Sequence, residues 1–450
     1  MTNVNTRELI LYILLEVNKN GEYSHIAIRN VMDKYQFLDK KDRSFIKIVS
    51  EGTIERKLSI DFMISQYSSV KINKMKPVIR EILRMSVYQM KYMDQVPVSA
   101  ICNEAVKLAS SKGFKNLKGF VNGVLRNMAR DEKEVFFPDL STRYSMPQWI
   151  VTLLVDTYGE EITENILKSS LVQKKTTIRC NMQKQSVEEL TEMLMKEGVT
   201  LQKAPLVENA LTLLEYDSIA RLDSFKKGCF SVQDLSSMLV GMIANPKEGN
   251  HVIDVCAAPG GKSLHIAELL KNTGLVLARD LTEYKVSMIR EGIERMGFAN
   301  IQAQIVDALV LNEEDIESAD LVIADLPCSG LGVMGRKNDL KYRMTEESMV
   351  ELVELQRNIL KIVSNYVKPG GILIYSTCTI NPNENVGNVS FITEQLPFLP
   401  VSFEEELPEE LRGGTATKGY LQLLQGNHPC DGFFISKFEK KESVRRYTNA

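Results

Sequence analysis

From residue 250 onward, short apolar runs alternate with glycine-containing turns and helical segments. Strands are expected at residues 251–257, 274–281, 301–306, 320–324 and 371–376, and helices at residues 263–271, 284–296 and 345–367. This alternation is typical of a doubly wound, mainly parallel β-sheet with helices on both faces. Ligands of such sheets bind beyond the carboxyl ends of the strands. We therefore expect the functional residues of this region at those strand ends.

The first third of the chain has a different pattern. Between residues 7 and 130 the apolar residues recur at helical spacing, and turn signals divide them into five or six helices. Residues 171–245 mix short strands with one helix. The sequence thus predicts a multidomain chain. An all-α domain at residues 1–135 is followed by a connector with a small α+β subdomain at residues 136–245 and an α/β Rossmann-like domain at residues 246–442.

Composition narrows the class of protein. The chain has 450 residues, of which 44% are hydrophobic and 25% charged, enough to build several cores. No apolar run reaches the roughly 18 residues that a membrane span needs, and the amino terminus is polar, so we expect a cytoplasmic protein with no membrane partner. The seven cysteines are scattered without a CxxC pair and there are only four histidines, so neither a disulfide framework nor a metal site is expected.

The two parts of the chain differ in charge. Residues 1–130 contain 22 Lys and Arg against 12 Asp and Glu, a balance of +10, whereas residues 131–450 contain 33 against 46, a balance of −13. A basic helical module attached to an acidic body suggests a polyanionic partner for the module, because neutralised phosphates release counterions. An ordinary solvated surface would give the same balance, so charge alone leaves both interpretations open.

The first strand of the α/β region runs into a loop of small residues. Two glycines and a proline let the backbone turn sharply and approach a ligand, and the next helix offers free N–H groups. The predicted cofactor loop comprises Cys256, Ala257, Ala258, Pro259, Gly260, Gly261 and Lys262. It lacks the first glycine of a phosphate-binding P-loop. Asp280 and Asp307 end the next two strands, where carboxylates contact the ribose and base of nucleoside cofactors, although helix capping would also explain them.

Two cysteines follow the last two predicted parallel strands. Cys328 comes shortly after Asp325, and Cys378 lies in a run of hydroxyl residues. A lone cysteine is most often a core residue, but two at neighbouring strand ends indicate thiol chemistry. Carbon C5 of cytosine becomes nucleophilic when a thiolate adds to C6, and the reaction then needs a second group for release and an acid near N3.

Several strings carry a resemblance to a known family. The strings CAAPGGK (256–262), DLPCSGLG (325–332), STCTINPNEN (376–385) and FSVQDLSS (230–237) resemble the Nol/Nop/Sun family of S-adenosylmethionine-dependent RNA cytosine-5 methyltransferases. The front third resembles the NusB-like RNA-binding domain at residues 23–24, 96–97, 103–106 and 120–127. This fusion implies methylation of C5 of a specific cytosine in small-subunit (16S) rRNA, with S-adenosyl-L-methionine as cofactor and RNA, not DNA, as partner. A monomer is expected.

The resemblance also implies roles for individual residues. The loop at residues 256–262 would hold the methionine part of the cofactor, Asp280 its ribose and Asp307 its adenine. Asp325 would lie between cofactor and cytosine and polarise the base. Cys378 would be the nucleophile that forms a covalent adduct with C6, and Cys328 would assist release of the product. The other cysteines, Cys102, Cys180, Cys229 and Cys430, are expected to be core or surface residues.

The sequence leaves three alternatives open. In a DNA cytosine-5 methyltransferase Cys328 would be the nucleophile, and Glu384-Asn385-Val386 matches a motif of that family, but the cofactor loop and the basic front domain do not fit it. A NusB-like RNA-binding factor with an inactive rear domain would have lost a cysteine or the glycine pair. An active enzyme that methylates tRNA or 23S rRNA would carry the same reaction motifs.

Overall fold

The computed structural model describes residues 4–131 and 133–442, so the first three residues and Glu132 of the predicted front domain lie outside it. By its contacts the chain divides into two units. One comprises residues 1–173 together with Met334–Arg343, and the other comprises Lys174–Val333 and the chain from Met344 onward. The domain boundaries expected from the sequence remain a prediction.

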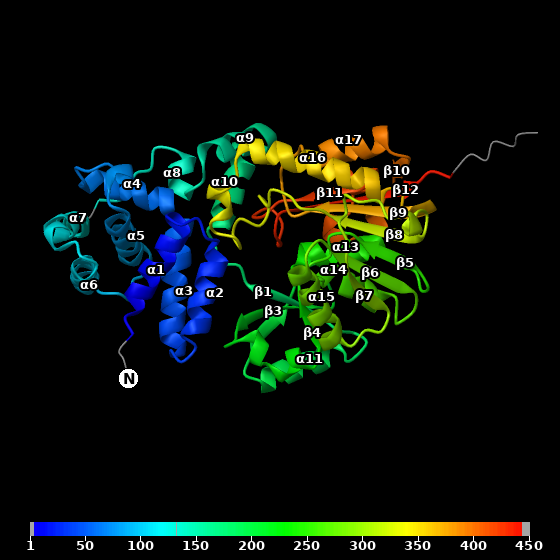
Figure 1. Ribbon diagram of the computed structural model, residues 1–450, viewed down its shortest axis with the longest axis horizontal. Helices are drawn as coiled ribbons and strands as arrows, with labels where there is room; N and C mark the ends of the chain where they lie inside the picture. Colours follow the sequence, from blue (N-terminus) through cyan, green and yellow to red (C-terminus); the bar gives the residue numbers. More distant parts are fainter. Residues whose placement is uncertain (1–3, 132, 443–450) are drawn as a thin grey trace, which may run out of the picture. The chain divides into compact units, whose positions relative to one another are not determined.

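The first unit is helical. Its helices are α1 (Thr6–Asn18), α2 (Ser24–Lys34), α3 (Lys40–Glu55), α4 (Lys57–Tyr67), α5 (Pro77–Tyr92), α6 (Val98–Ser111), α7 (Lys118–Arg130), α8 (Leu140–Tyr144), α9 (Gln148–Tyr158) and α10 (Glu160–Ser170) (Figure 1). Residues 6–130, all described, thus form seven α-helices where five or six were expected. Two boundaries lack the glycine or proline that marks most turns. They are residues 35–39 between α2 and α3, and Arg56, where α3 ends and α4 begins.

A short segment from the rear of the sequence completes this helical unit. Met334–Arg343 includes a 3₁₀ turn, and its Asp339 accepts hydrogen bonds from the backbone N and Oγ of Ser24, at 3.1 and 2.6 Å. The Tyr342 hydroxyl donates to the backbone O of Glu55 at 2.9 Å. Lys341 is 2% exposed, and burial lowers its pKa to about 7 against the attraction of Glu55. The segment is therefore an integral part of the unit.

The second unit contains two β-sheets. The smaller one has the strand order β2-β3-β1-β4, with all pairs antiparallel. Its elements are β1 (Thr176–Cys180), α11 (Val187–Lys196), β2 (Thr200–Lys203), β3 (Ala210–Glu215), α12 (Asp223–Lys226) and β4 (Phe230–Val232). Its core packs Ile178, Leu190 and Phe230 together. This is the small α+β fold expected for the region.

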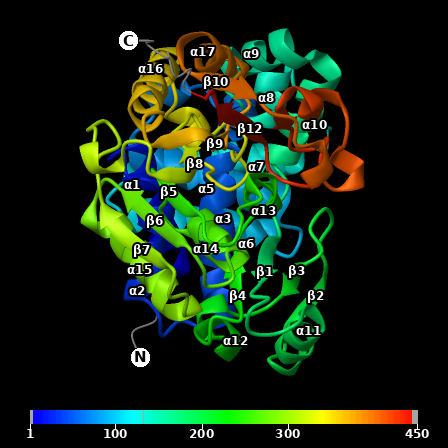
Figure 2. The ribbon, with the colours of Figure 1, turned by 90° about the vertical axis from the view of Figure 1, so that its right-hand side faces the viewer.

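The larger sheet has the order β10-β12-β9-β8-β5-β6-β7, and β11 pairs with β12. Its elements are α13 (Leu235–Ala244), β5 (His251–Asp254), α14 (Gly261–Leu269), β6 (Leu275–Asp280), α15 (Glu283–Met296), β7 (Ile301–Ile305), β8 (Ala319–Asp325), α16 (Glu346–Val363), β9 (Val367–Thr377), α17 (Val386–Gln395), β10 (Phe398–Pro400), β11 (Tyr420–Leu423) and β12 (Phe433–Lys440). Strands β5 to β9 pair in parallel, and β10 to β12 add an antiparallel edge. Figure 2 shows β5 in the middle of the parallel part, between β6 and β8.

Helices cover both faces of this sheet (Figure 1). Alternate residues of a strand point to opposite faces, so Val252 packs with α13, α14 and α15, whereas Ile253 packs with α16 and α17. A strand buried on both faces is apolar along its length. This explains why the apolar runs of the sequence predicted the parallel strands, and the expected doubly wound fold is confirmed.

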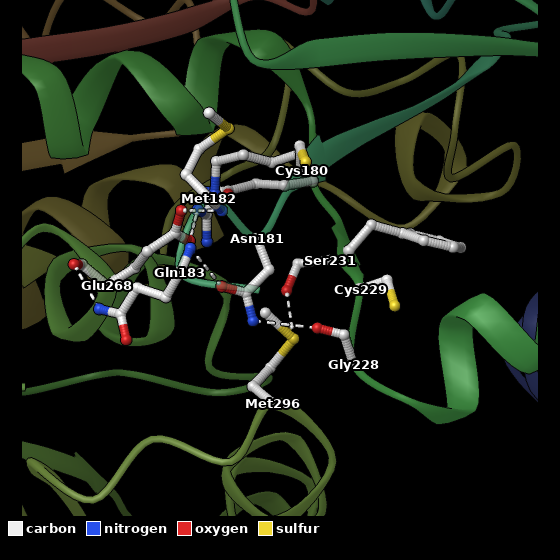
Figure 3. Close-up of polar contacts among 12 residues, drawn as sticks. Cys180, Asn181, Met182, Gln183, Gly228, Cys229, Ser231, Glu268 and Met296 are labelled. Carbon is white, nitrogen blue, oxygen red and sulfur yellow. Dashed lines mark hydrogen bonds and ion pairs between the residues drawn. The ribbon is translucent and has the colours of Figure 1, made fainter. Parts of the chain in front are cut away.

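The small sheet is attached to the large one through buried polar contacts (Figure 3). Glu268, near the end of α14, accepts a hydrogen bond from the backbone N of Met182 at 3.0 Å and pairs with the fully buried Arg179 of β1. The Ser231 hydroxyl of β4 contacts Sδ of Met296 at 3.4 Å, at the end of α15. These contacts join the small sheet to the two helices that follow β5 and β6.

Candidate active site

The predicted cofactor loop connects β5 to α14. Its Ala257 N donates to the backbone O of Arg279 on β6 at 2.8 Å, and its Gly260 N donates to the O of Ala257 at 2.7 Å. Gly260 precedes α14 with a φ of 107°, a left-handed conformation that favours glycine. The loop is thereby held over the ends of β5 and β6, with the N–H groups of the first turn of α14 next to it.

Two buried carboxylates flank this loop. Asp254, the last residue of β5, is 1% exposed and accepts a hydrogen bond from Ser263 Oγ at 2.6 Å through Oδ2. Its Oδ1 is buried without a partner among the described residues. Burial raises the pKa of Asp254 to about 7. Asp280, at the end of β6, accepts hydrogen bonds from Ala258 N at 3.0 Å and from Lys285 Nζ at 2.9 Å.

Asp307 lies in a different setting from Asp280. It is exposed in the loop after β7, and its Oδ1 accepts a hydrogen bond from Leu309 N at 2.9 Å. The structure therefore links Asp280 directly to the cofactor loop, whereas this contact of Asp307 stabilises its own turn.

The two cysteines meet beyond the ends of neighbouring strands. Strands β8 and β9 are parallel with Asp325 opposite Ser376, so the loops that follow them leave the sheet side by side. The Sγ atoms of Cys328 and Cys378 are 3.3 Å apart. The hydrogen bond with Cys378, together with burial, raises the pKa of Cys328 well above its ordinary value. Cys328 therefore keeps its proton near neutral pH.

A lysine connects the cofactor loop to the thiols. Lys262 Nζ lies 2.6 Å from Asp325 Oδ2, and Ser376 Oγ donates to the other oxygen of Asp325 at 2.8 Å. Burial lowers the pKa of Lys262, but the Asp325 carboxylate outweighs this effect and the pKa is raised. Lys262 thus remains charged near Cys378, where a cation stabilises a thiolate.

Two contributors to this site lie outside the residues predicted from the sequence. Asp254 and Ser376 were treated only as parts of strands, yet Asp254 supplies an unpaired carboxylate oxygen and Ser376 orients Asp325. Both occupy the carboxyl ends of parallel strands, and this position was the available signal. The remaining four cysteines, Cys102, Cys180, Cys229 and Cys430, are free and buried.

The fold and the site define a class of protein: a parallel-sheet domain of the methyltransferase type, with a thiol pair at its strand ends and a helical domain earlier in the sequence. Comparisons with known proteins agree. The model described as 16S rRNA methyltransferase RsmB/F matches residues 241–439, the NusB family matches residues 4–130, and the RsmF/B-like ferredoxin-like domain matches residues 146–219.

Close relatives extend over the whole chain. The Probable ribosomal RNA small subunit methyltransferase B of Bacillus subtilis is 38% identical over 98% of this chain and 100% of its own length, and the Synechocystis protein of the same name is 33% identical over 97% and 100%. The crystal structure of PH0851 covers 97% of this chain and 99% of its own, with a TM-score of 0.81 and 25% identity. The chain belongs to the RsmB/F family of 16S rRNA methyltransferases. The NusB-like front domain expected from the sequence is confirmed.

None of the described helices is long and apolar enough to cross a membrane.

Proposed function

We propose that this protein methylates carbon C5 of a cytosine in small-subunit rRNA, with S-adenosyl-L-methionine as methyl donor. The family supports the reaction class, and relatives carry names that specify the small ribosomal subunit. The observation that carries the chemistry is the thiol pair, with Cys328 and Cys378 at 3.3 Å beside Asp325. An RNA substrate of this kind also implies a cytoplasmic location.

The residues around the loop fit S-adenosylmethionine. Its sulfonium and ammonium groups are cationic, and the orphaned buried oxygen of Asp254, with Asp280 nearby, gives this end of the sheet the carboxylates that a cation needs. Cys256 to Lys262 and Asp280 would hold the molecule, with Asp307 toward its adenine. When bound, the cofactor supplies an electrophilic methyl group.

The chain's own residues carry the other steps. The sulfur of Cys378 forms a bond to C6 of the cytosine, and the electrons of the C5–C6 double bond become available at C5. Asp325, oriented by Ser376 and paired with Lys262, polarises the base. After methylation the C5 proton leaves, and the electrons of the C5–H bond re-form the C5–C6 double bond. The C6–S bond then breaks, and its electrons return to Cys378 as a thiolate.

The structure supports a reason why the two thiols have different tasks. The largest cause of the raised pKa of Cys328 is its hydrogen bond with Cys378. Once the sulfur of Cys378 is bonded to C6, that cause is removed, and the Cys328 thiol releases its proton to solvent and becomes a thiolate. Cys328 is then suited to accept the proton from C5 and so to promote release of the product.

The RNA partner is assigned to the basic front domain, which would hold phosphates around a cytosine that is unpaired or flipped out of its stack. A DNA-type mechanism is disfavoured, because Glu384 of the Glu-Asn-Val string is 0% exposed and its carboxylate accepts a hydrogen bond from Ser329 N, 2.9 Å away. Such a carboxylate does not reach a base.

The test measures transfer of labelled methyl groups to unmethylated small-subunit rRNA, tRNA and 23S rRNA, with covalent protein–RNA adducts followed on denaturing gels. Cys378→Ala should abolish both transfer and adduct, whereas Cys328→Ala should accumulate the adduct. Cys430→Ala, at a buried cysteine outside the pair, is the matched control and should behave as wild type. Labelling of tRNA or 23S rRNA alone would replace the substrate, and an adduct formed through Cys328 would overturn the assignment of the nucleophile.

A further inference from the structure

Glu384 is a buried carboxylate that the proposed reaction does not use. It lies in the turn between β9 and α17 and is 0% exposed. Its Oε2 accepts hydrogen bonds from Ser329 N at 2.9 Å and Gln356 Nε2 at 2.8 Å, and its Oε1 accepts from Ser329 Oγ and from Asn381 Nδ2. These four donors are neutral, and they come from the loop after β8, from α16 and from its own turn.

These contacts fix the backbone on both sides of Cys328. Ser329 follows Cys328 directly, and both its N–H and its hydroxyl are bound by Glu384. Gln356 uses the amide group that reaches Glu384 to donate also to the backbone O of Pro327, at 2.9 Å. The residues before and after Cys328 are therefore held by one cluster of hydrogen bonds.

The same cluster extends to the other cysteine. The hydroxyl of Ser329 lies 2.7 Å from Oγ1 of Thr379, which follows Cys378 directly. In addition, Gly332 N donates to the backbone O of Cys378 at 3.1 Å. The neighbours of both cysteines are thus tied to each other, and Glu384 is bound at the centre of the connection.

We propose that Glu384 is a positioning residue, which sets the distance and orientation of the Cys328 and Cys378 thiols by clamping Ser329 between the two loops. Only a carboxylate offers acceptors on both oxygens for four donors; a glutamine at this place would present an N–H₂ group to two of them. A buried donor without an acceptor is costly, so the loops of Glu384→Gln would rearrange. The inference rests on the proposed thiol chemistry for its consequence in catalysis.

The positioning itself is tested without RNA or cofactor. Diamide takes two electrons and two protons from a thiol pair, so the rate at which the Cys328–Cys378 disulfide forms reports how closely the sulfurs are held. Peptide mass spectrometry separates this disulfide from others. We expect Glu384→Gln to slow its formation at least about tenfold. Glu268→Gln removes a buried carboxylate in the same unit, one that pairs with Arg179, and should leave the rate unchanged (Glu268 is labelled in Figure 3).

A milder variant keeps the test decisive if Glu384→Gln does not fold. Ser329→Ala keeps the backbone N–H bond to Glu384 but removes the hydroxyl bonds to Glu384 and Thr379, and a smaller decrease is expected. Wild-type disulfide rates in a folded Glu384→Gln, or in Ser329→Ala when the former does not fold, would overturn the inference.

Activity measurements separate this inference from the proposed function. Misplacement of a reacting group by about 1 Å costs about 100-fold in rate. Glu384→Gln should therefore lower kcat by up to about 100-fold while KM for S-adenosylmethionine stays constant, because the cofactor loop is not part of the cluster. If Cys378→Ala still transferred methyl groups, the proposed function would fail, but the effect of Glu384 on disulfide formation would stand.

Discussion

The buried carboxylate of Asp254 gives the protein a predictable dependence of stability on pH. Its pKa is about 7 in the folded protein and about 3.9 in an unfolded chain. The folded state therefore binds this proton more tightly, and the free energy of unfolding falls as pH rises from about 4 to about 7. About three pKa units correspond to about 4 kcal/mol, a loss that is complete above pH 7.

Asp254→Asn removes this titration but keeps an oxygen for the hydrogen bond from Ser263. Without cofactor, the variant should match wild type near pH 4 and gain stability steadily until, above pH 7, it exceeds wild type by up to about 4 kcal/mol. Urea unfolding of both proteins at several pH values measures the difference, in which the titration of all other groups cancels. Asp307→Asn, at an exposed strand-end carboxylate, is the control and should show no such trend.

Parallel pH profiles for wild type and Asp254→Asn would refute the reasoning, because they would mean that burial of Asp254 does not shift its pKa. A cofactor-binding measurement completes the experiment: if the orphaned oxygen of Asp254 serves the cationic cofactor, the more stable variant should bind S-adenosylmethionine more weakly.

Two further predictions concern single positions. A Cβ added at Gly332 would lie 1.9 Å from the backbone O of Gly432. Gly332→Ala should therefore lower the free energy of unfolding by about 1–3 kcal/mol or more, measured by urea unfolding, and should lower kcat for methyl transfer. A urea midpoint equal to that of the wild type would contradict this. Lys341→Met should raise the melting temperature most at or below pH 7, because the wild-type protein then buries a charged lysine. The gain in melting temperature should shrink as pH rises from 7 to 10, because Lys341 loses its proton in the folded wild type. A gain that is independent of pH would refute the explanation.

The sequence predicted the features that depend on a local pattern of apolar residues and turns. Strands β5 to β9 were placed within a few residues because each is an apolar run between turns, and Cys328 and Cys378 were expected together because parallel strands end at one edge. Helix α17 was missed: Gly387 and several β-branched residues give residues 386–395 weak helix propensity, and the buried Asn388 fixes the helix through tertiary contacts.

Contacts between distant residues were beyond the reach of sequence patterns. Glu384 belongs to two sequence strings, STCTINPNEN and Glu-Asn-Val, but nothing local indicates that its acceptors face Ser329, 55 residues away. The pairing of Ser24 with Asp339 spans 315 residues. Neither Ser24 nor Asp339 belongs to a periodic pattern, so only the folded structure shows that they are partners.

The segment Met334–Arg343 has a consequence for truncation of this protein and for exchange of its domains. It starts six residues after Cys328, and yet it completes the helical unit through Asp339, Lys341 and Tyr342. Deletion of the residues before 135 would remove the packing partners of these side chains and loosen the loop that follows Cys328. A loss of activity in such a truncated protein would therefore not by itself measure a loss of RNA binding. For the same reason the helical unit cannot be exchanged by itself. A chimera that takes this unit from a relative would also need the ten residues of that relative that correspond to Met334–Arg343.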